Sequence, residues 1–320
     1  MKPFENDLPL RTPISHDFLM SMRALGEHRG RQVLYTRQFP EVLETLRRAA
    51  LLQGTESSCR LDGIGIPPER MTAIVAGKAG PRDGRERIVA GYRDILAQIQ
   101  SSAGSLWLSA DLVRGWHGTV TEASGAPSTA MADLERVIEL FQQSLIEGRV
   151  DPLILIADFL LDFSCMRTFG GGMGRLGRLL AVFLLLQNGY DAVRYVALER
   201  ILEGEGEAFA DALRQGSRGW TEGKQDLAPW WGYCVRVLTA VYRDFESRVG
   251  RITSSRGAKR EMVRRAVEGL PRSFAMADIR RACPGVSAQT FQRALDDLVR
   301  EDRLRIFGRG ADTRWERTEE

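Results

Sequence analysis

The residues best suited to chemistry lie in one short segment, 167–178, which combines a run of glycines with three arginines. The glycines between 170 and 174 leave backbone N–H groups free to point into a pocket, beside the N-terminus of a helix that begins near Arg175. Arg175 and Arg178 lie one helical turn apart and would add charge-assisted contacts to a bound anion. The segment fits a phosphate site and it also fits a tight turn between two helices, so both interpretations stay open.

Two apolar segments flank this loop and have to position it. Residues 152–166 and 176–188 are apolar almost all round, which predicts two helices buried in the middle of a bundle. The glycine run cannot continue either helix, because glycine is costly in a helix interior. We therefore expect a loop held between two buried helices.

The rest of the chain up to residue 250 has helical periodicity and almost no alternating segments, so the main body is predicted to be all-α. A polar turn is expected at 54–58, a loop at 63–70 that leads into a helix with proline in its first turn, and a loop at 124–129. The further helical segments are 17–54, 84–100, 108–123, 130–147, 194–217 and 228–250.

The C-terminal part has a different pattern. After a linker at 251–257, residues 261–269 and 276–283 read as two helices separated from a third by a Pro284-Gly285 turn. Ser287 is expected to cap the third helix, whose apolar face carries Phe291, Leu295 and Leu298. Segments 304–307 and 313–316 alternate like two strands around a turn at 308–312. This order predicts a small winged helix-turn-helix domain.

The segment 167–178 resembles the signature of the Fic (Fido) domain family, His-Pro-Phe-x-Asp/Glu-Gly-Asn-Gly/Lys-Arg-x-x-Arg, which lies between two buried helices. Residues 55–63 resemble the Ser-x-x-x-Glu-Gly inhibitory helix of many members. The resemblance extends over essentially the whole chain, including a winged helix that some members carry, and the chain looks like a bacterial-type member. The other segments that resemble the family are 158–163, 176–180, 194–200, 220–223 and 229–230.

The resemblance implies four regions: an N-terminal helical region with the inhibitory-type helix at 1–83, a Fic-like helical core at 84–250, the linker at 251–257 and the winged helix at 258–320. The predicted fold class is mainly α, with a Fic-like helical bundle followed by the small winged helix-turn-helix domain.

Fic enzymes transfer AMP from ATP to a protein hydroxyl, and this chain departs from their motif at the positions that do the chemistry. The family histidine, a general base, is replaced by Arg167, which cannot accept a proton. The family acid, which holds Mg²⁺, is replaced by Gly171, and the phosphate-binding asparagine by Met173. A further departure, Thr168 for proline, is a lesser change. We therefore expect a degenerate motif, no metal site and loss of the ordinary chemistry.

Other motif positions are retained. Phe169 would pack in the core, and the resemblance assigns Gly172, Gly174, Arg175 and Arg178 to phosphate or nucleotide binding. ATP or another nucleotide is the ligand that fits them, without Mg²⁺. The resemblance also implies a β-hairpin flap that clamps the target segment, for which residues 121–127 leave no room. His117, on an amphipathic helix, is expected to be structural.

The inhibitory-type segment is altered as well. Asp62 stands where the family has glutamate and could still pair with Arg178, so that Ser58 and Asp62 would close the anion pocket. The alternative is that Ser58 and Asp62 only cap a helix.

The candidate DNA-binding residues lie on the third C-terminal helix and the wing. Residues 255–320 hold 15 Lys+Arg against 11 Asp+Glu, while the remainder holds 30 against 31. Genomic codon bias is the alternative explanation of the arginine excess, and a winged helix can also mediate protein contacts. The residues of types that reach bases or phosphates are Ser287, Gln289, Thr290, Gln292, Arg293, Arg305 and Arg309.

Composition restricts the class of protein and its cellular location. The chain has 320 residues and is 43% hydrophobic, it starts without an apolar leader, and its longest apolar run, Leu179–Leu186, is too short for a membrane span. Its cysteines are scattered, which is typical of buried thiols in the cytoplasm. We hypothesise a cytoplasmic, homodimeric pseudoenzyme that acts as a DNA-binding or regulatory module. The alternative is a nucleotide-dependent transferase of AMPylation type with altered chemistry.

Overall fold

The structure, a computed structural model, describes residues 4, 7–36, 40–121, 128–249, 258–284, 286–308 and 313–318. The first helices of the body are α2 (Leu8–Arg11), α3 (His16–Thr36), α4 (Pro40–Leu61), α5 (Pro68–Val75), α6 (Gly84–Ser102), α7 (Ala110–Val120) and α8 (Ser128–Glu147). They are followed by α9 (Pro152–Met166), α10 (Met173–Gln187), α11 (Leu198–Gly204), α12 (Gly206–Ser217) and α13 (Ala228–Val249). Short 3-10 turns occupy Ala103–Ser105, Asp191–Arg194 and Trp220–Glu222.

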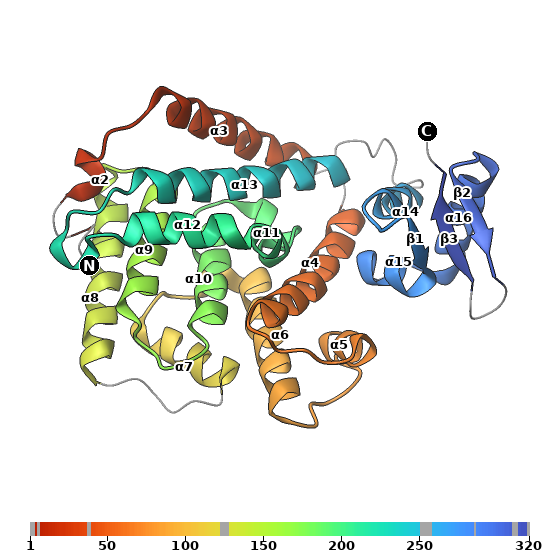
Figure 1. Ribbon diagram of the computed structural model, residues 1–320, viewed down its shortest axis with the longest axis horizontal. Helices are drawn as coiled ribbons and strands as arrows, with labels where there is room; N and C mark the ends of the chain where they lie inside the picture. Colours follow the sequence, from red (N-terminus) through yellow and green to blue (C-terminus); the bar gives the residue numbers. More distant parts are fainter. Residues whose placement is uncertain are drawn as a thin grey trace.

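Helices α9 and α10 form the centre of the body, with α6, α7, α8 and α13 around them (Figure 1). Asp151 caps α9 by accepting a hydrogen bond from the Leu153 backbone N–H at 2.8 Å. Along α10, every residue from Leu179 to Leu186 is buried. The expectation of two buried helices around a loop is confirmed, and α10 begins at Met173, slightly earlier than expected.

The N-terminal helices share this core. Helix α3 packs along α13, and α4 packs against α6 and α11 (Figure 1). Gln32 links α3 to α10 and α13: it donates to the Gly189 carbonyl, just after α10, at 2.8 Å and accepts from the Tyr242 hydroxyl of α13 at 2.7 Å. The described residues before 258 contain no strand, which confirms the all-α prediction for that part of the chain.

The turn predicted at 54–58 is wrong, because those residues lie inside α4. Their small size serves helix packing: a Cβ built on Gly54 would lie 2.8 Å from the Glu199 Oε2 atom of α11. Glycine there allows α4 and α11 to approach closely, so the polar, small residues mark an interhelical contact. The predicted helical segment 17–54 is also two helices, and 194–217 is divided between a 3-10 turn, α11 and α12.

The C-terminal module contains α14 (Ala258–Glu268), β1 (Ser273–Ala275), α15 (Met276–Ala282), α16 (Ala288–Arg300), β2 (Leu304–Phe307) and β3 (Arg314–Arg317). Its antiparallel sheet has the order β1-β3-β2. Phe274 pairs with Trp315 across β1 and β3, with their rings stacked 6.3 Å apart. The predicted helices and both strands are confirmed. Strand β1 was missed, since three residues are too few to show alternation.

The module rests on the body through α14 and α15, which contact α4. Lys259 forms an ion pair with Glu41 at 3.4 Å, and Arg265 donates to the Ser247 carbonyl. Helix α16 and the sheet lie on the side of the module away from the body (Figure 1). The linker 251–257, Gly285 and the turn residues 309–312 are outside the described residues.

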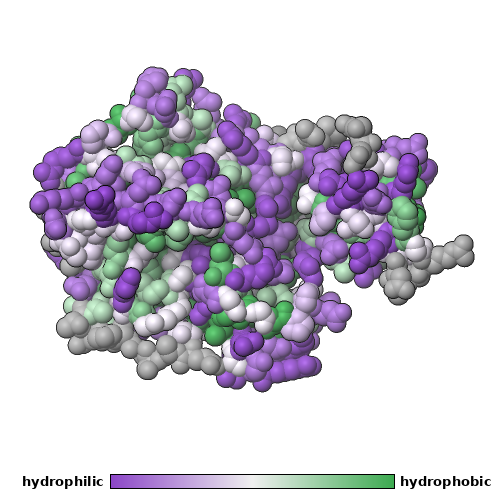
Figure 2. All heavy atoms as spheres, viewed as in Figure 1, coloured by the Kyte–Doolittle hydropathy of each residue, from purple (hydrophilic) through white to green (hydrophobic). Residues whose placement is uncertain are grey.

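The face of the molecule in Figure 2 is mainly hydrophilic, with hydrophobic residues visible on the body below α12. None of the helices in the described part of the chain is both long and apolar enough to cross a membrane. All four cysteines are free thiols. Burial raises the pKa of Cys59 and Cys283 to about 12.

Candidate functional site

The glycine-rich loop joins α9 to α10 through two residues with left-handed backbone. Arg167 ends α9 with φ of 48°, and Gly172 precedes α10 with φ of 70°. Gly172 suits this conformation because glycine has no Cβ to clash. The side chain of Arg167 is exposed. The chain reverses within six residues, so the loop is both the tight interhelical turn and the start of the α10 helix.

Phe169 and His117 fix the loop to α7. The two rings stack 4.1 Å apart, and both side chains are buried. The His117 Nε2 atom lies 2.8 Å from the Gly171 carbonyl oxygen. A carbonyl only accepts, so Nε2 carries the proton in this contact. His117 therefore braces the loop, in agreement with its expected structural role.

The Asp62 carboxylate binds the two motif arginines, one with each oxygen. Arg175 Nη1 donates to Oδ2 at 2.6 Å, and Arg178 Nη2 donates to Oδ1 at 2.7 Å. The side chains of Arg175, Arg178 and Asp62 are 8%, 12% and 19% exposed. The expected pairing of Asp62 with Arg178 is present, and the pairing with Arg175 is a contact that the sequence did not indicate.

Further hydrogen bonds orient each arginine. Arg178 donates through Nε to the Ser58 hydroxyl at 2.8 Å and through Nη2 to the Ser58 carbonyl at 2.9 Å. Arg175 donates through Nε to the Val120 carbonyl at 3.0 Å, which ties α10 to the end of α7. The interpretation of Ser58 and Asp62 as helix N-caps is wrong: Ser58 lies in the last turns of α4, and Asp62 follows its end.

The Asp62 carboxylate also covers the first turn of α10. A Cβ built on Gly174 would lie 3.0 Å from Asp62 Oδ1 and 3.1 Å from Arg178 Nη1, so a larger residue there would push against both side chains. The first turn of a helix presents unpaired N–H groups and the positive end of the helix dipole. The position suited to a bound anion is thus filled by the chain's own carboxylate.

Ion pairs hold the end of α4 over this position. Arg60 binds Glu203 of α11 at 2.6 Å and Glu56 at 2.8 Å. Behind them the Tyr92 hydroxyl donates to Glu199 at 2.7 Å, and burial raises the pKa of Glu199. Sequence reasoning did not single out Arg60, Glu203 or Tyr92, because charged and aromatic residues at helical spacing are typical of any packed helix.

Positions 171 and 173, which carry the chemistry in the Fic signature, lack the functional groups that the signature requires. Gly171 has no side chain, and Met173 is half-buried with a thioether that cannot donate a hydrogen bond. No cluster of three or more His, Cys, Asp or Glu suited to a metal ion occurs among the described residues. The predicted absence of a flap concerns residues 121–127, of which 122–127 lie outside the described part of the chain.

Helix α16 presents its polar residues in two groups. Ser287 caps the helix, accepting from the Thr290 N–H at 3.2 Å, and the two hydroxyl groups lie 2.8 Å apart. Gln292 donates to Asp296 at 2.9 Å. The side chains of Gln289 and Arg293 are exposed and form no hydrogen bond or ion pair with the described residues, and neither does the side chain of Arg305 on β2. Arg309, the remaining candidate, is outside the described residues.

The charged residues at the end of α16 and on the outer elements of the module differ in whether they are paired. Two acidic residues near the C-terminal end of α16 pair with arginines of α14: Arg260 binds Asp297 and Arg264 binds Glu301. Three exposed arginines on α16 and the β2–β3 hairpin, by contrast, have no ion pair within the described part of the chain. These unpaired arginines are Arg293, Arg305 and Arg314.

Comparisons with solved structures identify the fold. A Fic family protein from Desulfovibrio desulfuricans G20 matches with a TM-score of 0.59 and 17% identity, over 96% of this chain and 98% of that chain. A Fic domain containing signaling protein from Bacteroides thetaiotaomicron VPI-5482 matches with a TM-score of 0.57 and 15% identity, over 71% of this chain and 98% of its own. Fic-1 from C. elegans matches with a TM-score of 0.56 and 16% identity, over 71% of each chain.

No family model matches the sequence, and no curated protein matches it. The structural matches show that this chain has the fold of Fic family proteins. The match to the Desulfovibrio protein spans 96% of this chain and is therefore long enough to include residues of the C-terminal module.

Proposed function

We propose that this chain is a catalytically degenerate Fic-type protein that acts as a regulator through a DNA-binding winged helix. The observation that carries the proposal is the position of Arg293, Arg305 and Arg314, which stay unpaired on the outer elements of the module while Asp297 and Glu301 are paired with arginines of α14. An arginine without a partner is available to a phosphate group, and a paired one has to break its contact first.

The proposed loss of chemistry rests on the loop. Position 167 carries an arginine, which cannot act as a general base, and position 171 has no side chain to hold a metal ion. Removing a positioned base lowers a rate by about 10²–10⁴-fold. We expect no transfer of AMP from labelled ATP to this protein or to proteins of a lysate. Label incorporation that disappears in the Arg175→Ala variant would contradict the proposal.

DNA binding is proposed to use the N-terminal half of α16 and the hairpin. Gln289 and Arg293 are exposed and would reach base edges, while Ser287 and the amides of the first turn would face a phosphate. Arg305, and Arg309 by sequence alone, would contact the backbone from the wing. One small module binds weakly, so we further propose a cytoplasmic homodimer that places two modules on two half-sites.

The test is a salt series. Fluorescence anisotropy of the full chain on duplex fragments that flank its own reading frame should give a log–log slope of about −0.9 per phosphate neutralised. Arg293→Ala and Gln289→Ala should mainly reduce discrimination between sequences, by roughly 1–3 kcal/mol per lost base contact. Absence of binding at low salt would leave a protein partner as the target of the module.

One observation favours the second candidate, a nucleotide-dependent transferase with altered chemistry. Arg175 and Arg178 lie at the start of α10 where both could bind one anion, and in this structure the Asp62 carboxylate occupies that position. Thermal shift with ATP and ADP, with and without Mg²⁺, separates the two candidates. Stabilisation by ATP that depends on Mg²⁺ would favour the transferase.

A further inference from the structure

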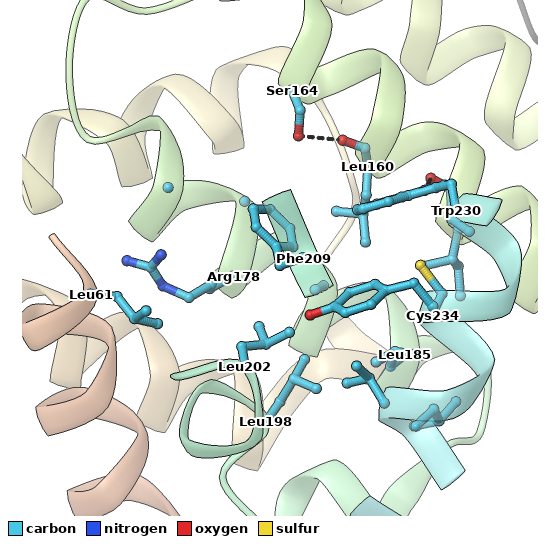
Figure 3. Close-up of a pocket in the computed structure, with 18 of the residues that line it drawn as sticks. Leu61, Leu160, Ser164, Arg178, Leu185, Leu198, Leu202, Phe209, Trp230 and Cys234 are labelled. Atoms are coloured by element: carbon cyan, nitrogen blue, oxygen red, sulfur yellow. Dashed lines mark hydrogen bonds between the residues drawn. The ribbon is translucent and has the colours of Figure 1, made fainter. Parts of the chain in front are cut away.

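Helix α3 has a face with apolar side chains that the described residues leave uncovered. Twelve large apolar side chains are exposed in the described part of the chain, and four of them, between 43% and 58% exposed, belong to α3: Leu19, Met20, Val33 and Leu34. Leu61 and Phe209, by contrast, line the cavity of Figure 3 beside the anion site. A group of exposed apolar side chains on one surface is typical of a protein interaction site.

This exposed face runs along most of α3. Its residues recur at spacings of three, four and seven, which brings them to one side of a helix. Along the chain they are Leu19, Met20, Arg23, Gly26, Glu27, Gly30, Val33 and Leu34. The other side of α3, where Leu25 and Gln32 are buried, packs along α13, so the exposed face points away from the body (Figure 1).

The centre of the exposed face combines two opposite charges with open space. Arg23 and Glu27 form an ion pair at 3.2 Å, and their side chains are 69% and 54% exposed. Gly26 and Gly30 lie beside them, and a Cβ built on either glycine would meet no atom within 4 Å. A long side chain from a second molecule therefore has room to lie over either glycine.

The apolar residues at the two ends of the face match each other when two copies of α3 lie antiparallel. A twofold axis at 26–27 places Leu19 opposite Leu34 of the second copy and Met20 opposite Val33 of the second copy. One axis produces all of these contacts, because the residue numbers of each pair have the same sum. The apolar groups at both ends of the face are then removed from water.

The same axis also matches the charged residues. It places Arg23 over Gly30 of the second copy and Glu27 over Gly26 of the second copy, so each long side chain meets a glycine. Glu27 of the second copy is one helical turn from its Gly30, so opposite charges lie close together across the axis. In a parallel pair Arg23 would face Arg23 and Glu27 would face Glu27, which is unfavourable. Charge therefore selects the antiparallel arrangement.

We propose that the exposed face of α3 is the dimerisation surface of this chain, covered by the antiparallel α3 of a second copy. This inference rests on the proposed function, which requires a homodimer to place two C-terminal modules on two half-sites, and it adds which surface forms that dimer. The contact is isologous, as a closed twofold dimer requires. One pair of helices buries a small area, so we expect a dimer Kd of roughly 1–100 μM.

The experiment is sedimentation equilibrium of the full chain without DNA, at chain concentrations from about 1 to 200 μM. The wild type should pass from monomer to dimer over this range. Leu19→Asp/Leu34→Asp places a carboxylate at both ends of the face and should raise the dimer Kd at least tenfold. The matched control, Trp107→Asp/Ile146→Asp, makes the same change at two side chains outside α3 that are 73% and 86% exposed, and should leave Kd within about threefold of the wild type. Since all four side chains are exposed, both variants should fold, which their melting temperatures check.

A charge exchange tests the contact at the axis. Arg23→Glu brings four carboxylates together around it and should raise the dimer Kd at least tenfold. Adding Glu27→Arg exchanges the two signs and should return the Kd to within about threefold of the wild type. The double variant has the net charge of the wild type. No recovery in the double variant would contradict the antiparallel register.

The outcomes separate this surface from the rest of the account. A dimer whose Kd is unchanged in Leu19→Asp/Leu34→Asp, or raised equally in the Trp107→Asp/Ile146→Asp control, would refute the surface and leave the proposed homodimer in place. A wild type that stays monomeric at every concentration would refute both the surface and the homodimer. Because DNA is absent from these measurements, neither result depends on whether the C-terminal module binds it.

Discussion

Replacing Asp62 by alanine should open the anion site and weaken the fold in the absence of a ligand. The carboxylate accepts one charge-assisted hydrogen bond from Arg175 and one from Arg178, and all three side chains are largely buried. Removing one partner of a buried ion pair costs about 3–5 kcal/mol. Because Asp62 is 19% exposed, we expect the lower end, about 3 kcal/mol, and a Tm about 6–12 °C lower.

The same change should strengthen anion binding. In the wild type a phosphate group has to displace a carboxylate held by two bonds of about 1.5–3 kcal/mol each. Displacing the carboxylate costs about 3 kcal/mol in the wild type, and the variant does not have this cost. Its Kd for pyrophosphate or ATP should therefore be roughly hundredfold lower. Calorimetry on both proteins measures the two Kd values. Binding of pyrophosphate should also raise the lowered Tm of the variant back toward that of the wild type.

A matched control uses the same end of α4. Glu203→Ala removes a carboxylate that binds Arg60 at 2.6 Å, outside the anion site, and should leave pyrophosphate affinity unchanged. Asp62→Asn, which keeps an acceptor without the charge, should fall between the wild type and Asp62→Ala. Equal or weaker binding of pyrophosphate by Asp62→Ala would refute the view that Asp62 closes an anion site.

Three further predictions concern two close contacts of glycines and one buried carboxyl group. Gly54→Ala should destabilise the protein by about 1–3 kcal/mol in urea unfolding, although alanine is the better helix former, because its Cβ meets Glu199. Gly30→Ala on α3, where a Cβ meets no atom within 4 Å, should instead stabilise by about 0.5–1 kcal/mol, and stabilisation by both would contradict the packing argument. Burial raises the pKa of Asp158 well above its usual value, so above about pH 4 the folded state keeps a proton that the unfolded state has lost. The contribution of Asp158 to the free energy of unfolding therefore falls as pH rises above about 4. Thermal melts over a pH series should show Asp158→Asn gaining stability over the wild type with rising pH, and a constant difference would refute this. Gly174→Val should displace Asp62 and Arg178 and lower Tm, measured against the wild type; an unchanged Tm would show that the carboxylate does not cover this turn.

Much of the architecture follows from periodicity. The apolar segments around the loop and the capping serine before α16 have strong local signals, and both predictions are confirmed. The pairing of Asp62 with Arg178 followed from the resemblance, since 116 residues separate them and no local pattern connects them.

Other features depend on contacts between distant segments. The Gly54-Thr55-Glu56-Ser57-Ser58 segment is typical of a turn in sequence, and the close approach of Glu199 to Gly54 depends on the packing of α4 against α11, which no local pattern predicts. The contact of Arg175 with the Val120 carbonyl involves a backbone group, which leaves no trace in the residue type. The unpaired state of Arg293, Arg305 and Arg314 depends on which acids lie near them in space, so counting charges in the sequence could not find it.

The most direct test of the proposed function compares two triple variants of the full chain on the same duplex DNA. One removes the unpaired arginines (Arg293→Ala, Arg305→Ala, Arg314→Ala), and the other removes three paired ones (Arg260→Ala, Arg272→Ala, Arg303→Ala). Both lose the same net charge. In an anisotropy titration over a salt series, the first should bind at least tenfold more weakly and lose roughly 0.9 from its log–log salt slope for each contact removed, while the second stays within about threefold of the wild type. Equal losses in the two variants, or no binding of the wild type at low salt, would contradict the account.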